Sequence, residues 1–471
     1  MDKKSLINYF DLLAKGRRGW KARNKYYYRQ LEKYLRFLIP EGSSVIEIGC
    51  GTGEILAALK PSRGVGLDFS AEMIKIAKDK FPGLEFRVED AHDLKIEEKF
   101  DYVILSDLIG SLLDVQEALG QLKKICAPQT RIIITYYNYL WEPILRLAEN
   151  LKLKTPQPLQ NWLSIYDIEN LLSLSGFEVI KKGYKLIFPK YIPLVSSFLN
   201  RVIGNLPLIN RLSLTEIVIA RLNSSSYKTD AGNYTCSIVI PCRNEKGNIR
   251  AAIERTPDLG KHTELIFIEG HSKDGTLEEV KKQIKEFPGR DIKVFIQDGI
   301  GKGDAVKKGF FQATGDILMI LDADLTTPPE DLPKFYRALA EGKGELIIGS
   351  RLVYSVGEGA MRFLNLLGNK FFSSLFSYLL EQRIKDTLCG TKVLFRRDYR
   401  KIEKNREFFG DFDPFGDFDL IFGAAKQNLK IIEIPIRYMA RTYGSTQISR
   451  FRHGLLLLKM SGIALKKLKM V

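Results

Sequence analysis

Short apolar segments rich in β-branched residues alternate with longer helical patterns along this chain, and a single polar stretch interrupts the alternation near its middle. Such an alternation is typical of α/β domains built on a largely parallel sheet. The interrupting stretch, 223–234, is serine-rich and has no apolar periodicity, which is typical of a linker. The pattern therefore predicts two α/β domains. The strand candidates are 44–48, 64–67, 102–105, 131–135, 177–180 and 216–220 before the linker, and 236–240, 264–268, 293–296, 317–321 and 345–348 after it.

Length and composition agree with this division. A chain of 471 residues with 45% apolar residues is long enough for two domains that each bury a core. We expect domains at 1–222 and 235–447, the linker at 223–234, and a basic amphipathic C-terminal helix at 448–471. The five cysteines are scattered and form no C-x-x-C pair, which favours a reducing cytoplasm over a disulfide framework or a zinc site.

The net charge of +16 indicates a negatively charged partner. Nucleic acid, an anionic membrane surface and phosphorylated substrates are all consistent with it, and a merely basic surface is the alternative. No apolar run reaches the roughly 18–20 residues that a membrane-spanning helix needs. The N-terminus has basic residues but no apolar segment typical of a secretory signal.

The N-terminal half contains a strand, 44–48, that leads through Gly49, Gly51 and Gly53 into a helix. Glycines at such a turn allow the backbone to approach a ligand closely. Asp68 ends the next strand candidate, where an acidic residue can accept hydrogen bonds from a ribose diol. The dinucleotide fingerprint needs a third glycine where this chain has Glu54, so a NAD site is disfavoured.

The pattern E-x-G-x-G-x-G resembles the class I S-adenosylmethionine (SAM)-dependent methyltransferases, and the resemblance covers about residues 20–222. It implies a Rossmann-like, seven-stranded domain that binds SAM. Residues 106–108 occupy the place where that family lines its methyl-acceptor pocket, and Asp107 is a candidate general base, with a simple capping role as the alternative. The positions that match the family's cofactor site are Glu47, Gly49, Gly51, Gly53, Asp68, Asp90 and Ala91.

Four motifs follow one another in the C-terminal half. They are Ser237–Glu245 (SIVIPCRNE), Leu265–Thr276 (LIFIEGHSKDGT), Gly301–Ala305 (GKGDA) and Gly315–Asp324 (GDILMILDAD). Together they resemble the GT-A glycosyltransferases of family 2, in particular the dolichyl-phosphate mannose synthase and polyprenyl-phosphate glycosyltransferase branch, over about residues 234–450. The resemblance implies a GT-A fold and a nucleotide-sugar donor.

The chemistry explains why carboxylates end the fourth motif. The leaving group is a nucleoside diphosphate, and Asp-x-Asp after an apolar strand supplies hard oxygen ligands for Mg²⁺ or Mn²⁺. We predict a metal site at Asp322 and Asp324, with Thr326 near a further ligand position. The resemblance implies that the nucleotide sugar is bound by Pro241, Arg243, Glu245, Lys302 and Ala323.

The chain departs from the family at one motif. Two aspartates usually follow the second strand, where this chain has Glu269 and Gly270. Glu269 can still contact a nucleobase, but the departure leaves uridine and guanosine donors open.

Further motifs bear on the acceptor. Arg351, Arg362 and Arg441 match arginines that bind donor and acceptor phosphates in the branch, although a surface ion pair is the alternative for each. A lipid phosphate is already ionised at neutral pH, so positioning by arginines suffices. A hydroxyl acceptor would need a carboxylate base, and Asp417 lies about where related enzymes place one.

The sequence therefore predicts a bifunctional enzyme in glycan assembly, with SAM and Mg²⁺ or Mn²⁺ as cofactors. Its glycosyltransferase domain would transfer a sugar, with inversion, from a UDP- or GDP-sugar to a polyprenyl phosphate. The first alternative is a hydroxyl acceptor on a glycan or small molecule. The second is a nucleic-acid methyltransferase with a degenerate sugar-binding module, which is disfavoured because no long basic stripe carries interleaved aromatic residues. We expect a cytoplasmic protein, and the basic segment 448–471 is suited to lying on the anionic inner face of the cell membrane, with core packing as the alternative.

Overall fold

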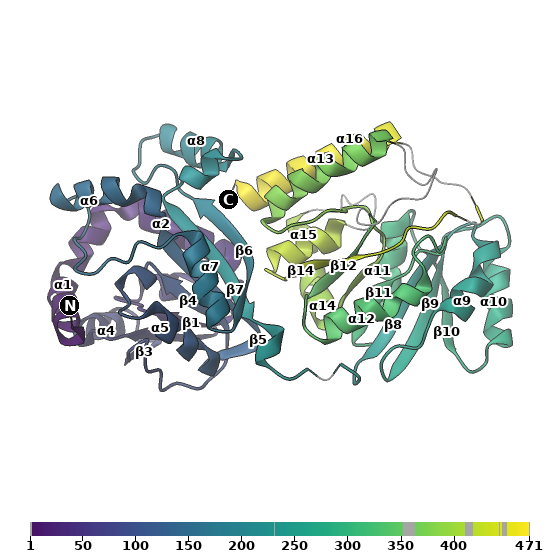
Figure 1. Ribbon diagram of the computed structural model, residues 1–471, viewed down its shortest axis with the longest axis horizontal. Coiled ribbons are helices and arrows are strands. Elements are labelled where there is room, and N and C mark those ends of the chain that lie inside the picture. The colour runs from purple at the N-terminus through teal and green to yellow at the C-terminus, as the bar shows by residue number, and fades with distance from the viewer. Residues whose placement is uncertain are drawn as a thin grey trace. The chain divides into compact units, whose positions relative to one another are not determined.

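The computed structural model describes residues 2–229, 231–351, 363–409, 418–441, 443–444 and 450–470. The chain forms two compact units, the first made of Met1–Tyr227 with Lys469–Val471 and the second of Lys228–Leu468. Figure 1 labels the helices and strands of both units. Within the described ranges, no helix is long and apolar enough to cross a membrane.

The first unit is built on a seven-stranded mixed sheet with the order β3-β2-β1-β4-β5-β7-β6. The strands from β3 to β5 are parallel, whereas β7 runs antiparallel to both β5 and β6. The strands are β1 (Ser44–Ile48), β2 (Arg63–Asp68), β3 (Glu85–Val88), β4 (Phe100–Ser106), β5 (Cys126–Tyr137), β6 (Phe177–Lys185) and β7 (Thr215–Leu222). The helices are α1 (Lys3–Arg23), α2 (Lys25–Leu38), α3 (Glu54–Ala58), α4 (Ala71–Lys80), α5 (Val115–Gln121), α6 (Glu142–Asn150), α7 (Ile165–Leu174) and α8 (Val195–Arg201).

The second unit has its own seven-stranded mixed sheet, with the order β10-β9-β8-β11-β13-β12-β14. Strand β13 runs antiparallel to both of its neighbours, β11 and β12, and the other pairs are parallel. The strands are β8 (Thr235–Cys242), β9 (His262–Glu269), β10 (Asp291–Ile296), β11 (Ile317–Ile320), β12 (Leu346–Ser350), β13 (Lys392–Phe395) and β14 (Ile431–Pro435). The helices are α9 (Ile249–Arg255), α10 (Thr276–Glu286), α11 (Lys302–Gln312), α12 (Leu332–Ala340), α13 (Phe363–Leu380), α14 (Arg396–Lys404), α15 (Phe418–Lys426) and α16 (Arg450–Ala464).

Burial explains why these segments form strands. The central strands of each sheet are covered on both faces, and strand β11, for example, is buried at every position. Near-continuous apolar runs are expected for such strands. The prediction of two α/β domains, one Rossmann-like and one of GT-A type, is confirmed by the two seven-stranded mixed sheets.

Candidate active sites

The first candidate site begins at the glycine loop between β1 and α3. Gly49, Gly51 and Gly53 have φ angles of 72°, 53° and 79°, in the left-handed region that favours glycine. A Cβ atom on Gly49 would lie 2.6 Å from a methyl carbon of Leu108. The loop therefore follows the end of β1 in a conformation that side chains would prevent.

Two predicted acidic residues support this loop in different ways. The Asp68 carboxylate accepts hydrogen bonds from the backbone N–H groups of Gly51 at 2.8 Å and Ser70 at 2.9 Å. Glu47 is buried in β1 and accepts a hydrogen bond from the Leu56 N–H at 3.1 Å, and burial raises its pKa to about 8. Asp68 lines the pocket beside the loop. Glu47 is not one of the residues that line the pocket, and it stabilises the loop from the β1 side.

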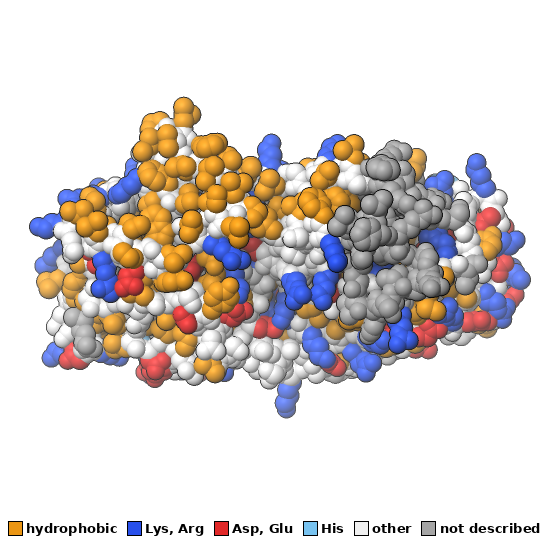
Figure 2. Space-filling view, turned by 45° about the horizontal axis from the view of Figure 1, so that its top comes forward, with side chains coloured by type: hydrophobic (Ala, Val, Ile, Leu, Met, Phe, Trp, Pro, Cys, Tyr) orange, Lys and Arg blue, Asp and Glu red, His pale blue; other side chains and the backbone are white. Residues whose placement is uncertain are grey.

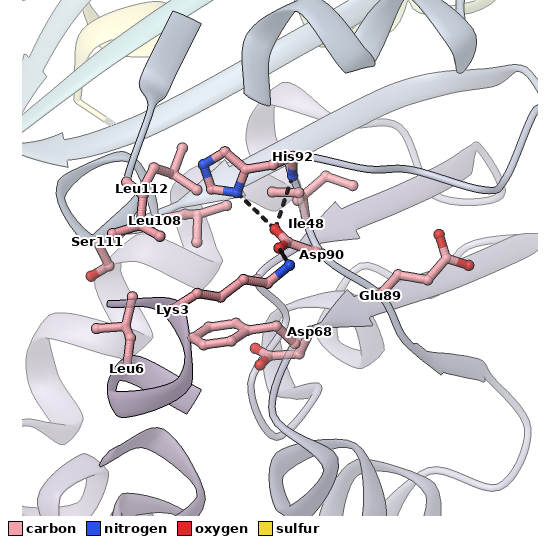
Figure 3. A pocket seen from close by; sticks show the side chains of 14 residues that line it. Lys3, Leu6, Ile48, Asp68, Glu89, Asp90, His92, Leu108, Ser111 and Leu112 are labelled. Atoms are coloured by element: carbon pink, nitrogen blue, oxygen red, sulfur yellow. Dashed lines mark hydrogen bonds and ion pairs between the residues drawn. The ribbon is translucent and has the colours of Figure 1, made fainter. Parts of the chain in front are cut away.

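The pocket lies at the carboxyl ends of β1, β2 and β3, and Figure 3 shows it from close by. Asp90 receives hydrogen bonds from the His92 backbone at 2.9 Å and pairs with Lys3 at 2.5 Å. Burial acts to raise the pKa of Asp90, but these partners lower it to about 2. The predicted residues that line this pocket are Gly49, Asp68, Asp90 and Ala91.

Helix α1 completes the pocket. The sequence did not predict which residues of this helix line it. Lys3 and Leu6 line the pocket together with Leu108 from the β4 end. Further along α1, an Nη atom of Arg17 lies 3.8 Å from the position of a Cβ on Gly51. Basic residues were noted at the N-terminus from the sequence, but neither Lys3 nor Leu6 was identified as a residue of this pocket.

Asp107 follows β4 and has a φ of 53°, an uncommon conformation for a residue other than glycine. The Tyr27 hydroxyl donates to both of its carboxylate oxygens, at 3.1 and 2.9 Å. Burial raises the pKa of Asp107 to about 6 despite this hydrogen bond. A carboxylate with such a pKa is largely ionised at neutral pH and can accept a proton.

The second candidate site lies where β8 and β11 end. Asp322 follows β11, and its carboxylate pairs at 2.5 Å with Lys302, the first residue of α11. Asp324 pairs at 2.5 Å with Arg441, which lies beyond β14, and accepts a hydrogen bond from the Thr326 hydroxyl at 2.8 Å. Burial acts to raise the pKa of Asp322, but the Lys302 ammonium keeps it below its usual value.

Glu245 joins this cluster from the end of β8. Its carboxylate lies 3.9 Å from the Arg441 guanidinium and accepts a hydrogen bond from the Asn248 amide at 2.7 Å. Burial, and then the charge of Asp324, raise the pKa of Glu245. The structure therefore brings together six of the predicted residues, which are Glu245, Lys302, Asp322, Asp324, Thr326 and Arg441.

Gly390 is part of this site although the prediction gave it no role there. It precedes β13, and a Cβ atom on it would overlap the Asp322 carboxylate and the Lys302 ammonium. Only a glycine leaves room for this ion pair beside the β13 backbone. The proximity of Gly390 to Asp322 depends on the sheet order, which places β13 beside β11.

Other predicted residues lie around the cluster or apart from it. The Glu269 carboxylate accepts hydrogen bonds from the backbone N–H groups of His271 at 3.2 Å and Ser272 at 2.5 Å. Pro241 lies in β8 opposite Ile268 of β9. Arg243 follows β8, and its Cβ lies 3.3 Å from the position of a Cβ on Gly270. Ala323 is buried between the two aspartates.

Arg351 is engaged by another residue. Its guanidinium binds the buried Asp386 carboxylate through two hydrogen bonds, of 2.7 and 2.8 Å. This bidentate pair fixes the end of β12 to the loop before β13. Arg362 and Asp417, which were predicted to bind substrate and to act in catalysis, lie outside the described residues.

The donor chemistry of the cluster fits a divalent cation. Asp322 and Asp324 supply carboxylate oxygens, which hard cations prefer. Among the described residues, no group of three or more His, Cys, Asp or Glu side chains is placed to hold a metal ion by itself. Mg²⁺ is commonly bound by one or two carboxylates together with substrate phosphates, so two aspartates beside a diphosphate are a fitting set.

Comparisons with known proteins agree with this arrangement. Residues 237–402 match the family model of glycosyl transferase family 2, and residues 20–182 match a methyltransferase domain. The chain thus contains a methyltransferase domain and a family 2 glycosyltransferase domain, and the latter resembles the dolichol-phosphate mannosyltransferases. The methyltransferase domain implies SAM as its cofactor.

Two relatives and one solved structure illustrate the similarity. Dolichol-phosphate mannosyltransferase of Saccharomyces cerevisiae is 35% identical over 127 residues, which cover 26% of this chain and 46% of that protein. Its counterpart from Pyrococcus furiosus is 27% identical over 217 residues, which cover 45% and 58%. The chain thus spans about half the length of these relatives. Magnesium protoporphyrin IX methyltransferase from Synechocystis, solved with bound SAH, is 17% identical to this chain, with a TM-score of 0.35. The matched region covers 47% of this chain and 100% of that structure.

Proposed function

We propose that the protein is a bifunctional enzyme. Residues 235–447 would transfer a sugar from a nucleoside-diphosphate sugar to a polyprenyl phosphate, and residues 1–222 would transfer a methyl group from SAM. The observation that carries the first activity is the cluster at the ends of β8 and β11, where Asp322 and Asp324 meet Lys302 and Arg441. The similarity to two dolichol-phosphate mannosyltransferases supports a lipid phosphate as the acceptor class.

The cluster offers both signs of charge to a sugar nucleotide. Asp322 and Asp324 would hold Mg²⁺ or Mn²⁺, which supplies Lewis-acid neutralisation of the diphosphate leaving group when it is bound. In the structure, Lys302 and Arg441 form ion pairs with the two carboxylates. If a cation bound to the carboxylates instead, each basic side chain could bind a phosphate oxygen. Glu245 lies within reach of Arg441 and can fix its orientation.

The two candidate acceptor classes differ in their need for a general base. A lipid phosphate attacks as an anion, so no general base is needed and a cation such as Arg441 can position it. A hydroxyl acceptor would have to lose a proton to a carboxylate. Asp419, two residues beyond Asp417, is held by Arg406 at 2.5 Å. Loss of activity in Asp417→Asn or Asp419→Asn, with the fold intact, would therefore favour the hydroxyl acceptor.

The methyltransferase activity rests on the glycine loop and the carboxylates beside it. Asp68 and Asp90 end β2 and follow β3, where they can accept hydrogen bonds from the ribose and the adenine amine of SAM. Asp107, held by Tyr27, can accept the proton that the methyl acceptor releases. Positioning accounts for most of such a reaction when the acceptor is already nucleophilic.

We also propose that the protein acts at the cytoplasmic face of the membrane. Helix α16 carries the exposed residues Leu455 and Leu458, and basic residues follow it. This mixture is suited to an anionic lipid surface. Helix α16 also packs beside α13, so part of it serves the core of its own unit (Figure 1).

The experiment that tests the glycosyltransferase is product analysis by mass spectrometry. Purified protein is incubated with Mg²⁺ or Mn²⁺, UDP- and GDP-sugars and a short polyprenyl phosphate. We expect the lipid to gain one sugar, and we expect Asp324→Ala to abolish this gain. The matched control is Asp258→Ala, which removes a highly exposed carboxylate of the same unit that pairs with Arg290 at 3.2 Å. Release of nucleoside diphosphate without a glycosylated lipid would contradict the lipid acceptor.

A further inference from the structure

The connection between β6 and β7 is far longer than the two strands require. These strands are antiparallel neighbours, and such pairs are usually joined by about 2–5 residues. Here residues 186–214 form the connection, which contains α8 and two short 3₁₀ helices, Ile203–Asn205 and Ile209–Leu212. We name this segment the β6–β7 insert. A connection of this length is uncommon between neighbouring antiparallel strands.

The polarity of the β6–β7 insert is inverted. Leu194 and Leu208 are 88% and 74% exposed, whereas Ser196 is completely buried at 0% and Asn205 is 8% exposed. A surface segment normally places its apolar side chains inside and its polar ones outside. Further exposed apolar side chains of the insert are Tyr191, Ile192, Val195, Phe198, Val202, Leu206 and Leu212.

The two most exposed leucines also have unfavourable backbone conformations. Leu194 has a φ of 63° and Leu208 a φ of 73°. Residues with a Cβ rarely adopt such angles, because the Cβ then crowds the backbone. Neither burial nor backbone preference explains why a leucine stands at these turns. Their exposed side chains therefore point to a role outside the packing of this unit.

Hydrogen bonds hold the β6–β7 insert in a defined shape. The Ser196 hydroxyl accepts from the Ile192 N–H at 2.6 Å and donates to the Lys190 carbonyl at 2.8 Å. The Asn200 side chain accepts from the Phe188 N–H at 2.9 Å, and its amide nitrogen lies 3.1 Å from the Tyr26 hydroxyl of α2. The apolar side chains are thus presented by an ordered scaffold.

The exposed apolar surface continues from the insert onto the segment that contains α6. The indole N–H of Trp141 donates to the Leu212 carbonyl at 2.8 Å. Asn24 forms a second link between the insert and this segment. Its amide nitrogen donates to the Leu153 carbonyl at 3.2 Å, and its amide oxygen accepts from the Lys190 ammonium at 2.9 Å. The exposed apolar residues of this segment are Tyr139, Leu140, Ile144, Leu147, Leu151 and Leu153. We call them, together with those of the insert, the apolar face, and Figure 2 shows hydrophobic side chains gathered over this part of the first unit.

The charges around the apolar face indicate its partner. The β6–β7 insert contains no Asp or Glu, and its charged residues are Lys190, Arg201 and Arg211, all exposed. Large exposed apolar patches mark interaction sites. The segment that contains α6 adds Glu142 and Glu149, each of which forms an ion pair with a basic side chain, so the apolar face keeps a net positive charge. An apolar surface with an excess of basic charges complements acyl chains below anionic headgroups. A second copy of the same face would instead bring like charges together.

We propose that the apolar face docks the methyltransferase unit on the surface of an anionic lipid bilayer. Leu194 and Leu208 enter the acyl-chain region, and Lys190, Arg201 and Arg211 lie at the level of the lipid phosphates. This surface is distinct from the C-terminal helix α16. The proposal does not depend on the sugar-transfer activity.

Vesicle flotation of the full chain tests the docking. The vesicles are phosphatidylcholine with and without phosphatidylglycerol. We expect binding to the anionic vesicles and a loss of roughly tenfold or more in the partition coefficient for the double variant Leu194→Glu, Leu208→Glu. The matched control is Leu174→Glu, which changes an exposed leucine at the end of α7, outside the apolar face. Unchanged thermal unfolding shows that the variants are folded.

A second measurement reports insertion directly. All five native cysteines are buried, so an environment-sensitive fluorophore can be attached to Leu194→Cys or, as the control, Leu174→Cys. We expect a blue shift and increased intensity on addition of anionic vesicles at position 194 only. Equal vesicle binding by the wild type and the folded double variant would overturn the proposal. If Leu455→Glu loses binding while the double variant keeps it, the membrane contact belongs to α16 and the proposal is also overturned. A dimer that the double variant disrupts, without any vesicle binding, would assign the face to self-association instead.

Discussion

At the scale of single residues, Gly49 offers the sharpest test of the cofactor pocket. Gly49→Ala adds a methyl group 2.6 Å from Leu108 at a φ of 72°, so either the loop or Leu108 must move. We expect a loss of about 1–3 kcal/mol in unfolding free energy and a weakening of SAH binding by roughly tenfold or more. Calorimetric titration with SAH and thermal unfolding measure the two effects. The control is Gly83→Ala, where an added methyl group meets no atom within 4 Å. If Gly83→Ala weakens SAH binding as much as Gly49→Ala does, the glycine loop is not the cofactor site.

Asp107 allows a prediction about pH. Its pKa is raised to about 6, so the ionised form that can accept a proton becomes populated as pH rises through 6. We expect kcat/KM for methyl transfer to increase over that range and then to level off. Asp107→Asn should lower the rate by about 10²–10⁴-fold and abolish this limb of the profile.

A structural role for Asp107 would give another result. The variant would then shift unfolding through the lost Tyr27 contact and leave the shape of the pH profile unchanged. The control Asp79→Asn alters an exposed carboxylate on α4 and should leave the profile unaffected. Which acceptor the enzyme methylates must be established first, by screening with labelled SAM.

Residues close to one another in sequence could be grouped from local pattern, whereas a distant residue such as Arg441 was predicted only through the family resemblance. Gly49, Gly51 and Gly53 share one loop, and Asp322 and Asp324 one strand end, so their grouping follows from local pattern. The pairing of Arg441 with Asp324 joins segments far apart in the chain and depends on β14 running beside β12. Local pattern cannot supply such a contact.

At the scale of elements, helix α1 is linked through Asp11 to α4, beside the cofactor pocket. The Asp11 carboxylate accepts hydrogen bonds from the Ser70 hydroxyl at 2.5 Å and the Glu72 N–H at 3.3 Å, which fixes α1 to the start of α4. Lys3 and Leu6 of the same helix line the pocket. We expect Asp11→Ala to speed hydrogen exchange in α1 and to weaken SAH binding roughly 5- to 30-fold.

The matched control on that helix is Lys15→Ala, which removes an exposed side chain from α1. Hydrogen exchange followed by mass spectrometry compares both variants with and without SAH. If Asp11→Ala leaves exchange in α1 and the affinity for SAH unchanged, the helix does not act as a cover.

Strands differ in how well the sequence identifies them. Continuous apolar runs such as that of β11, buried at every position, were predicted because burial on both faces requires them. Strands β13 and β14 were not assigned: β13 has four residues, and β14 is half-buried at most positions and ends in a proline. The antiparallel insertion of β13 between β11 and β12 places Gly390 beside Asp322, and this juxtaposition follows from topology alone.

At the scale of the whole molecule, each unit has its own sheet and its own core clusters. Two such units are expected to unfold in separate transitions if each core is self-sufficient. A ligand that binds one folded unit stabilises that unit by about 2.7 kcal/mol at a hundredfold excess over its Kd, which raises its Tm by roughly 5–10 °C. Calorimetry of the intact chain can therefore assign each ligand to a unit.

We expect SAH to raise the Tm of one transition and a nucleoside diphosphate with Mn²⁺ to raise that of the other. Gly49→Ala should remove only the first shift, because the glycine loop belongs to the first unit. Asp324→Ala should remove only the second, because it takes away a carboxylate of the Asp322–Asp324 pair. A single transition that both ligands shift would mean that the units unfold as one.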